Sequence, residues 1–218
     1  DIDAILITHE HIDHIAGLGV LSRRYGIPIY TTEKTADAIQ ETKSVGKIPE
    51  ELFHPVCAEE AFTIKDLMVN PMHISHDAAD PVGYRFSYGS SHAAVCTDLG
   101  TYNDYTVECL KGMDVLLLEA NHDVNMLQVG SYPYYLKQRI LGNRGHLSNE
   151  NSGRLLSRVL HDNLKKVILG HLSQENNLPE LAYETVRMEI DLADNPYHGG
   201  DFPIQVAKRN EVSEMICF

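Results

Sequence analysis

Four side chains that can bind a metal lie close together near the start of the chain. His9, His11, Asp13 and His14 fall within six residues and bring three imidazoles and one carboxylate to one turn. On a strand exit, residues two apart point the same way, so His9 and His11 can hold one ion together. Asp13 and His14 can face a second ion, and this donor mixture suits zinc or manganese. The alternative is an ordinary polar turn before a helix.

Three further polar residues each follow a predicted strand. His76 comes after 69–75, Asp98 after 93–97 and His171 after 167–170. In layered α/β folds, loops gather at strand ends and sites are built there. A single histidine in such a place is usually a surface residue. Three such positions, together with the N-terminal cluster, indicate one metal site.

The composition favours a globular protein that does not coat nucleic acid or lipid by charge alone. The 218 residues are 43% hydrophobic and 22% charged, and no apolar run approaches the ~18 residues of a membrane span. A net charge of −13 opposes simple attraction to DNA, although bound divalent metals would still permit a nuclease. The four cysteines form no C-x-x-C pair, which predicts reduced, mostly packed thiols and a cytoplasmic protein.

Hydrophobic periodicity predicts one α/β domain over residues 1–218. The expected helices cover 15–25, 32–43, 104–111, 133–141, 148–160 and 179–192, and Thr32 and Ser148 are expected to cap two of them. The expected strands cover 2–7, 27–30, 62–75, 82–88, 92–97, 115–118, 167–169, 204–207 and 215–218. Strands 82–88 and 92–97 are expected to pair through a turn at Gly89-Ser90.

The ordered set of metal-binding residues resembles the signature of the metallo-β-lactamase fold hydrolases. The motif His9-x-His11-x-Asp13-His14, followed by His76, Asp98 and His171, carries this resemblance. It implies a four-layer αββα sandwich that holds two divalent ions, Zn²⁺ or Mn²⁺. By the resemblance, the first ion is held by His9, His11 and His76, and the second by Asp13, His14 and His171. Asp98 would bridge the two ions.

Segments between these residues are similar to those of the bacterial YycJ (WalJ) group of the superfamily, namely 75–84, 119–123, 145–149 and 170–173. This group is regarded as cytoplasmic, with 5′-to-3′ DNA exonuclease activity, and is similar in layout to ribonuclease Z. The resemblance implies a phosphodiesterase that acts on DNA ends through a metal-bridging hydroxide and has no membrane partner. Family members have a strand pair ahead of the histidine motif, so we expect this chain to lack those N-terminal strands.

Four residues are expected to take part in catalysis. Asp13 and Asp98 would hold the ions and orient the hydroxide. His146 is a candidate proton donor to the leaving oxygen or a phosphate contact, because imidazole is the commonest acid–base side chain in catalysis and the next helix offers free amides. Glu119 can hydrogen-bond that imidazole. Equally, His146 can be an ordinary histidine before a helix and Glu119 a plain strand-end carboxylate.

A tyrosine-rich stretch with nearby basic residues precedes His146: Tyr132, Tyr134, Tyr135, Lys137, Arg139 and Arg144. Aromatic faces can stack unpaired bases. Tyrosines in such a helix more often pack on the core, and we expect that here. A basic cluster is usually a solvated face, although this one lies where phosphates would arrive.

Two other functions are possible. A small-molecule hydrolase, such as a glutathione thioesterase, would share the metal site, but the His146-Leu147-Ser148 element resembles the nuclease branch. A non-enzymatic binding protein would not need a complete set of metal ligands. The sequence does not determine the native metal, whether the substrate is DNA or RNA, or the oligomeric state.

Overall fold

The computed structural model describes residues 2–218, which fall into two compact units. Of the described residues, unit 1 comprises 2–73 and Asp77–Tyr88, and unit 2 comprises Ile74–His76 and Gly89–Phe218. Each unit has its own strands and helices. The single domain expected over residues 1–218 stays a prediction.

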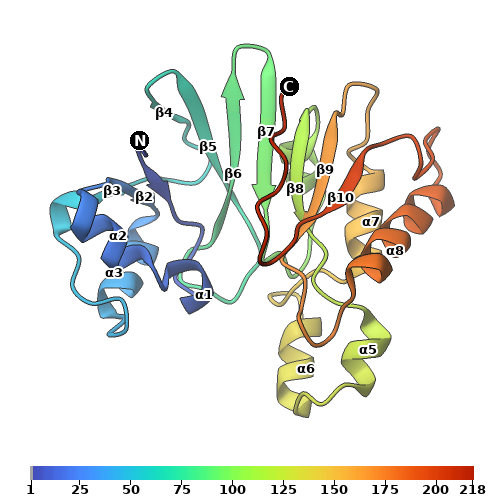
Figure 1. Cartoon of the computed structure of the whole chain (residues 1–218), viewed down its shortest axis with the longest axis horizontal. Coiled ribbons are helices and arrows are strands. Elements are labelled where there is room, and N and C mark those ends of the chain that lie inside the picture. The colour runs from blue at the N-terminus through green and yellow to red at the C-terminus, as the bar shows by residue number, and fades with distance from the viewer. Residues whose placement is uncertain (1) are drawn as a thin grey trace. The chain divides into compact units, whose positions relative to one another are not determined.

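Unit 1 contains a parallel sheet with the order β1-β2-β3 and an antiparallel set with the order β4-β5-β6. Its strands are β1 (Ile5–Leu6), β2 (Ile29–Thr31), β3 (Phe53–Pro55), β4 (Phe62–Ile64), β5 (Leu67–His73) and β6 (Val82–Tyr88). Its helices are α1 (Ile12–Ile15), α2 (Leu18–Tyr25), α3 (Glu33–Glu41) and the 3-10 turn Glu50–Leu52. Figure 1 shows these helices, in blue, packed beside the parallel strands.

The core of unit 1 holds the strand that leads into the histidine motif. Aliphatic side chains pack between the parallel strands and the helices: Ile7, Ile15, Leu18, Ile29, Ile39, Val45 and Ile48. Burying each of them stabilises the fold by roughly 1.5–3 kcal/mol. The Tyr84 hydroxyl donates to the Ile7 carbonyl at 2.9 Å, and the Val82 N–H donates to the Thr8 carbonyl at 3.0 Å. These bonds tie the end of β1 to β6 immediately before His9.

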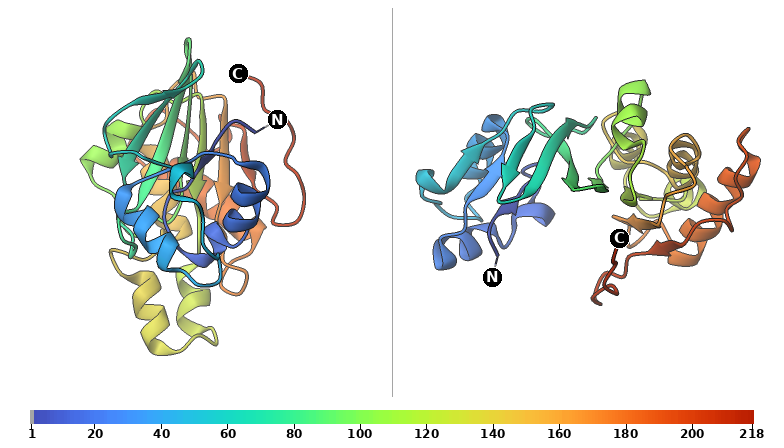
Figure 2. Two further views of the ribbon diagram at one scale, coloured as in Figure 1. Left: turned by 90° about the vertical axis from the view of Figure 1, so that its left-hand side faces the viewer. Right: turned by 90° about the horizontal axis from the view of Figure 1, so that it is seen from above.

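Unit 2 is built on a parallel sheet with the order β10-β9-β8-β7. Its strands are β7 (Ser91–Cys96), β8 (Val115–Glu119), β9 (Lys166–Gly170) and β10 (Ile204–Val206). Its helices are α4 (Asp104–Leu110), α5 (Val124–Val129), α6 (Tyr134–Leu141), α7 (Asn149–Ser157) and α8 (Pro179–Leu192). In Figures 1 and 2, α7 and α8 lie against the sheet, whereas α5 and α6 project beyond the ends of its strands.

The parallel register places the carboxyl ends of three strands of unit 2 at one edge. Cys96 pairs with Leu118, and Glu119 pairs with Gly170. The apolar run in β8 is largely buried, as expected of a strand covered on both faces. No helix among residues 2–218 is long and apolar enough to cross a bilayer.

Some sequence predictions of secondary structure are wrong. Segment 215–218 is not a strand: its side chains are apolar, but Met215, Cys217 and Phe218 stay exposed instead of packing on a sheet. The stretch 62–75 is not one strand but the hairpin of β4 and β5, which turns at Lys65 with a φ of 55°. Thr32 is the N-cap residue of α3, but its hydroxyl donates to the Asp80 carbonyl instead of capping the helix. Two elements, β3 and α5, have no counterpart among the predicted strands and helices.

Candidate metal centre

Three strands of unit 2 deliver polar side chains to one edge of the sheet. Glu119 ends β8, His171 directly follows β9, and Asp98 lies two residues beyond β7. Asp98 and His171 both adopt left-handed backbone conformations, with φ of 60° and 57°. Such conformations cost about 1–3 kcal/mol in a non-glycine residue and cluster at functional sites, because the surrounding structure must impose them.

The Glu119 carboxylate is a fully buried hydrogen-bond acceptor for four groups. Its Oε1 lies 2.9 Å from His146 Nδ1 and 2.8 Å from His171 Nδ1. Its Oε2 accepts from the backbone N–H groups of Leu99 at 2.8 Å and Leu147 at 3.1 Å. Burial alone would raise the pKa of Glu119, but the hydrogen bonds from the two imidazoles outweigh burial and hold it below its usual range.

The ionised Glu119 fixes which ring nitrogen of its partners can bind a metal. Because a carboxylate only accepts, His146 and His171 must each carry a proton on Nδ1. In the neutral ring, Nε2 then keeps its lone pair. This is the carboxylate–histidine arrangement that orients imidazole ligands toward metals in proteins.

Asp98 lies among three imidazoles and is 2% exposed. Its Oδ1 is 3.4 Å from His171 Nε2, 3.6 Å from His76 Nε2 and 3.7 Å from His146 Nδ1. Two ligands of one tetrahedral ion, each about 2.0–2.2 Å from the metal, lie roughly 3.4 Å apart. One ligand atom from each of Asp98, Glu119, His146 and His171 falls within 4.8 Å of the others. Because Glu119 and His146 Nδ1 are hydrogen-bonded to each other, the atoms of this group that remain available to a divalent ion are Asp98 Oδ1 and His171 Nε2.

His76 is oriented by the backbone. Its Nδ1 lies 3.0 Å from the Gly145 carbonyl, which can only accept, so the proton is on Nδ1 and Nε2 is available toward Asp98. The Arg144 Nε donates to the His76 carbonyl at 3.0 Å. Sequence reasoning missed both contacts, because a backbone carbonyl has no residue-specific signal.

The histidine motif of unit 1 forms a compact cluster of its own. The ring centroid of His9 lies 4.6 Å from that of His11 and 4.2 Å from that of His14. His9 is fully buried, with Nδ1 3.0 Å from the Thr8 hydroxyl. The motif was expected to be a loop, but α1 begins inside it, so Asp13 and His14 lie in a helical turn.

Residues 77–79 support this motif from the segment before β6. The Glu10 carboxylate accepts the Ala79 N–H at 2.7 Å, and Asp77 Oδ1 lies 3.8 Å from His11 Nε2. The sequence analysis did not assign a role to Glu10 or Asp77. Their positions at the motif became apparent only from the fold of unit 1.

The predicted site residues thus fall into two sets, and each set is brought together within its own unit. Unit 1 gathers His9, His11, Asp13 and His14. Unit 2 gathers His76, Asp98, Glu119, His146 and His171. The predicted hydrogen bond between Glu119 and His146 is confirmed, and Ser148 caps α7 as expected by accepting the Asn151 N–H.

The prediction that the tyrosines before His146 pack on the core is wrong for two of them. Tyr134 and Tyr135 are 76% and 74% exposed, whereas Tyr132 is half-buried. The reason is that α6 projects from the sheet and buries only Ile140.

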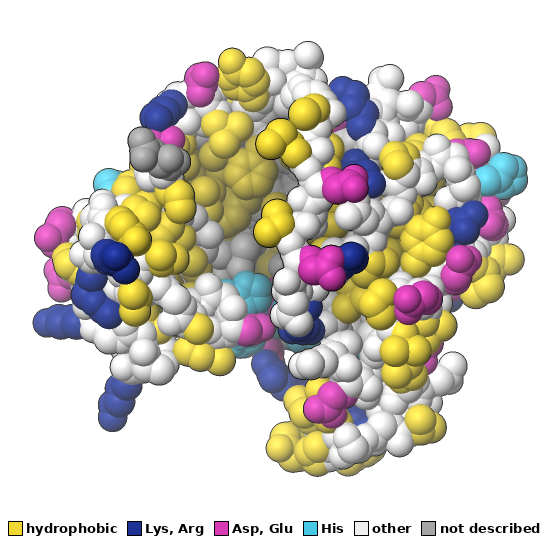
Figure 3. Space-filling model, viewed as in Figure 1, with side chains coloured by type: hydrophobic (Ala, Val, Ile, Leu, Met, Phe, Trp, Pro, Cys, Tyr) yellow, Lys and Arg dark blue, Asp and Glu magenta, His cyan; other side chains and the backbone are white. Residues whose placement is uncertain are grey.

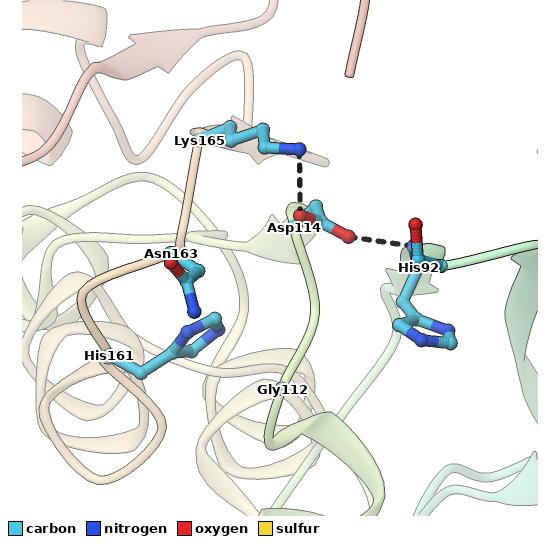
Figure 4. Close-up of a pocket in the computed structure, with 7 residues that line it drawn as sticks. His92, Gly112, Asp114, His161, Asn163 and Lys165 are labelled. Carbon is cyan, nitrogen blue, oxygen red and sulfur yellow. Dashed lines mark hydrogen bonds and ion pairs between the residues drawn. The ribbon is translucent and has the colours of Figure 1, made fainter.

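A separate cavity of about 360 Å³ lies at the opposite, amino-terminal edge of β7, β8 and β9. It is lined by Ser90, His92, Gly112, Asp114, His161, Asn163 and Lys165 (Figure 4). Asp114 accepts the His92 N–H at 2.8 Å and pairs with Lys165 Nζ at 3.0 Å. Burial by itself would raise the pKa of Asp114, but the hydrogen bond from His92 and the ion pair with Lys165 outweigh it and lower the pKa. The Asp114 carboxylate therefore links the amino-terminal ends of β7, β8 and β9.

Comparisons with known proteins relate the chain to metal-dependent hydrolases. A family model described as the beta-lactamase superfamily domain matches residues 1–171. The chain is 44% identical over 194 residues to "Exodeoxyribonuclease WalJ" of Streptococcus pneumoniae, covering 89% of this chain and 72% of that protein. It is 39% identical over 191 residues to "Exodeoxyribonuclease YycJ" of Bacillus anthracis, covering 88% and 72%. The structure of the metallo-beta-lactamase fold protein YhfI from Bacillus subtilis is similar with a TM-score of 0.68 and 17% identity, covering 95% and 75%.

Proposed function

Because the chain belongs to the metallo-β-lactamase superfamily, we propose that it is a metal-dependent exonuclease acting on DNA ends. The expected fold and the hydrolase class are confirmed by this membership and by the structural similarity. The observation that carries the proposal is the buried Glu119 carboxylate, which orients two imidazoles beside Asp98. The choice of DNA rests on two relatives that are named exodeoxyribonucleases.

Two divalent ions, Zn²⁺ or Mn²⁺, are proposed as the cofactors. One ion would be held by His9, His11 and His76, the other by Asp13, His14 and His171, and Asp98 would contact both. The support is chemical, because all these donors are imidazole nitrogens or carboxylate oxygens. Such ions, when bound, make water nucleophilic at neutral pH and offset the charge of the phosphate.

His146 is proposed to give a proton to the leaving oxygen. Its Nδ1–H is bonded to Glu119, whose negative charge stabilises the imidazolium and leaves Nε2–H as the donor. The Leu147 N–H is bonded to the same carboxylate, so ring and backbone move together. Glu119 acts as a positioning residue, because it reaches the reaction through His146 and His171.

We place the protein in the cytoplasm, as proposed from its reduced thiols. Cys57, Cys96, Cys109 and Cys217 are all free. Cys96 and Cys109 are buried, whereas Cys57 and Cys217 are exposed, so half rather than most are packed.

The test is nuclease activity of the purified chain with Mn²⁺ or Zn²⁺. We expect it to shorten 5′-phosphorylated single-stranded DNA labelled at the 3′ end, and chelation or Asp98→Ala should abolish this. Parallel reactions with RNA and with 3′-phosphorylated DNA establish substrate and polarity, and a thioester panel tests the small-molecule alternative. Activity that survives both chelation and Asp98→Ala would rule out the metal mechanism.

A further inference from the structure

A helical segment of unit 2 begins and ends beside the candidate metal centre. We call residues 124–144, which contain α5 and α6, the α5–α6 arm. The arm leaves the sheet shortly after Glu119 and returns immediately before His146, and these two side chains are hydrogen-bonded at 2.9 Å. At its return, the Asn143 carbonyl accepts the Ser75 hydroxyl at 2.8 Å. The two ends of the arm therefore lie beside the residues that we assign to catalysis.

The arm exposes large apolar side chains that the fold does not use. They are Val129 (86% exposed), Tyr134 (76%), Tyr135 (74%) and Leu141 (39%). Figure 3 shows hydrophobic side chains at the tip of this projection. Single exposed apolar residues are common, but a cluster on one projecting element is typical of a binding surface.

The arm also has a charge opposite to that of the rest of the chain. It contains Lys137, Arg139 and Arg144 and no Asp or Glu, whereas the rest of the chain carries all 31 acidic residues and the other 15 basic ones. Tyr135 and Arg139 are four residues apart in α6, so they share one face of the helix. An aromatic ring beside a guanidinium offers a stacking surface and a phosphate contact together.

The arm is held in shape by its own contacts. Lys137 Nζ, on α6, donates to the carbonyls of Gln128 at 2.8 Å and Gly130 at 2.7 Å, which end α5. The tyrosines are therefore carried on a fixed element, and less ordering is needed when a ligand binds.

We propose that the α5–α6 arm binds single-stranded DNA, with Tyr134 and Tyr135 stacking on unpaired bases and Arg139 contacting the backbone phosphates. The inference rests on the proposed exonuclease function and adds the surface that receives the strand next to the cleaved end. Single-strand binding sites combine aromatic faces with positive charge, and both occur here on one element of an acidic chain. A protein partner would not require the basic charge, so the DNA strand fits these observations better.

The test measures binding apart from cleavage. Anisotropy of a 3′-fluorescein oligothymidylate of about 12 nucleotides, recorded in chelator, gives the Kd of the intact chain and its variants. Tyr134→Ala and Tyr135→Ala are each expected to weaken binding by roughly tenfold, given the typical contribution of base stacking. Tyr134→Phe and Tyr135→Phe should bind normally, because stacking needs the ring and not the hydroxyl. Tyr88→Ala, which removes a side chain that is 60% exposed in unit 1, is the matched control.

The kinetics distinguish this inference from the proposed function. With Mn²⁺ present, the alanine variants should raise KM for single-stranded DNA more than they lower kcat, and their thermal midpoints should match that of the unmodified chain. Unchanged Kd and KM in the double alanine variant, while the unmodified chain degrades DNA, would overturn the inference and leave the function standing. An equal loss in Tyr88→Ala would also overturn it. If the unmodified chain neither binds nor degrades DNA, the proposed function itself fails.

Discussion

At the scale of single residues, the arrangement of the candidate site depends on where protons are held. Glu119 accepts hydrogen bonds from the Nδ1–H groups of His146 and His171, and the Gly145 carbonyl accepts one from the Nδ1–H of His76. Each ring is thereby left with Nε2 as its metal-binding or proton-donating atom. A buried carboxylate that accepts four hydrogen bonds is costly to alter, because every lost partner leaves a buried polar group unsatisfied.

Glu119→Gln should weaken the metal site more than it weakens the fold. An amide has one acceptor oxygen and no charge, so it cannot serve both imidazoles and two N–H groups. We expect metal affinity to fall by about 10–100-fold, as measured by competition with a chromogenic chelator. Asp114→Asn is the control, because it alters a buried carboxylate at the other end of β8. Metal affinity equal to that of the unmodified chain would show that Glu119 does not orient the ligands.

His122 should make folding sensitive to acid. Burial lowers its pKa to about 4 from an ordinary value of 6.5, and among the described residues its Nε2 has no hydrogen-bond partner. As the pH falls below 6.5, the unfolded chain binds a proton that the folded chain does not. Stability should therefore decline between pH 6.5 and 4, by on the order of 3 kcal/mol from this group.

Urea unfolding at several pH values tests the contribution of His122. His122→Gln should flatten the decline in stability over this range. His198→Gln, which alters an exposed ring, should leave the slope unchanged. Identical slopes for His122→Gln and the unmodified chain would exclude His122 as the source.

At the scale of elements, the site depends on strand ends and on one tight turn. Asp98 and His171 leave their strands in left-handed conformations, and Gly145 packs its backbone against the end of α6. A Cβ at Gly145 would lie 2.1 Å from the Ile140 carbonyl oxygen and 2.3 Å from that of Arg139. Since both contacts are to backbone, no side-chain movement can relieve them.

Gly145→Ala should open this turn and displace the neighbouring His146. The Gly145 carbonyl that orients His76 would move as well. We expect nuclease activity to fall at least tenfold and stability to fall by about 1–3 kcal/mol, as measured by end-labelled DNA digestion and chemical denaturation. Gly17→Ala, at which a Cβ meets nothing within 4 Å, should be close to neutral. Normal activity in Gly145→Ala would show that the turn does not position the site.

At the scale of the whole molecule, the residues proposed as metal ligands belong to both units. Unit 1 supplies the N-terminal histidine motif, and unit 2 supplies His76, Asp98 and His171. Metal that binds the folded chain and not the unfolded chain stabilises the fold. The net charge of −13 adds a second requirement, since DNA must be attracted locally by the ions and the basic arm.

Metal addition should therefore raise the melting temperature, and substitution of a residue that holds an ion should reduce the rise. At free metal of about one hundred times Kd, the gain is about 2.7 kcal/mol, or about 5–10 °C for a chain of this size. Scanning calorimetry with and without chelator measures it. His11→Ala in unit 1 and His171→Ala in unit 2 should each reduce the shift strongly. A full shift in either variant would show that the two sets of ligands do not share ions.

The sequence alone determined the features of this protein that depend on local pattern, namely its metal-binding motif and the residues at its strand ends. The spacing of His9, His11, Asp13 and His14 identified the motif, and hydrophobic runs placed Asp98 and His171 just after buried strands, where the structure has them. Such features can be read from sequence because strand periodicity and turn chemistry act over a few residues.

Only the tertiary structure decided how these residues are held. Glu119 bonds His171 across 52 positions, His76 bonds the Gly145 carbonyl across 69, and Tyr134 and Tyr135 are exposed because α6 projects from the sheet. Contacts so distant in sequence follow from strand order and packing, and the acceptor carbonyl is common to every residue type. Local periodicity carries no information about strand order or about which carbonyl accepts a hydrogen bond. The positions of the imidazole protons and the exposure of the α5–α6 arm could therefore be determined only from the folded chain.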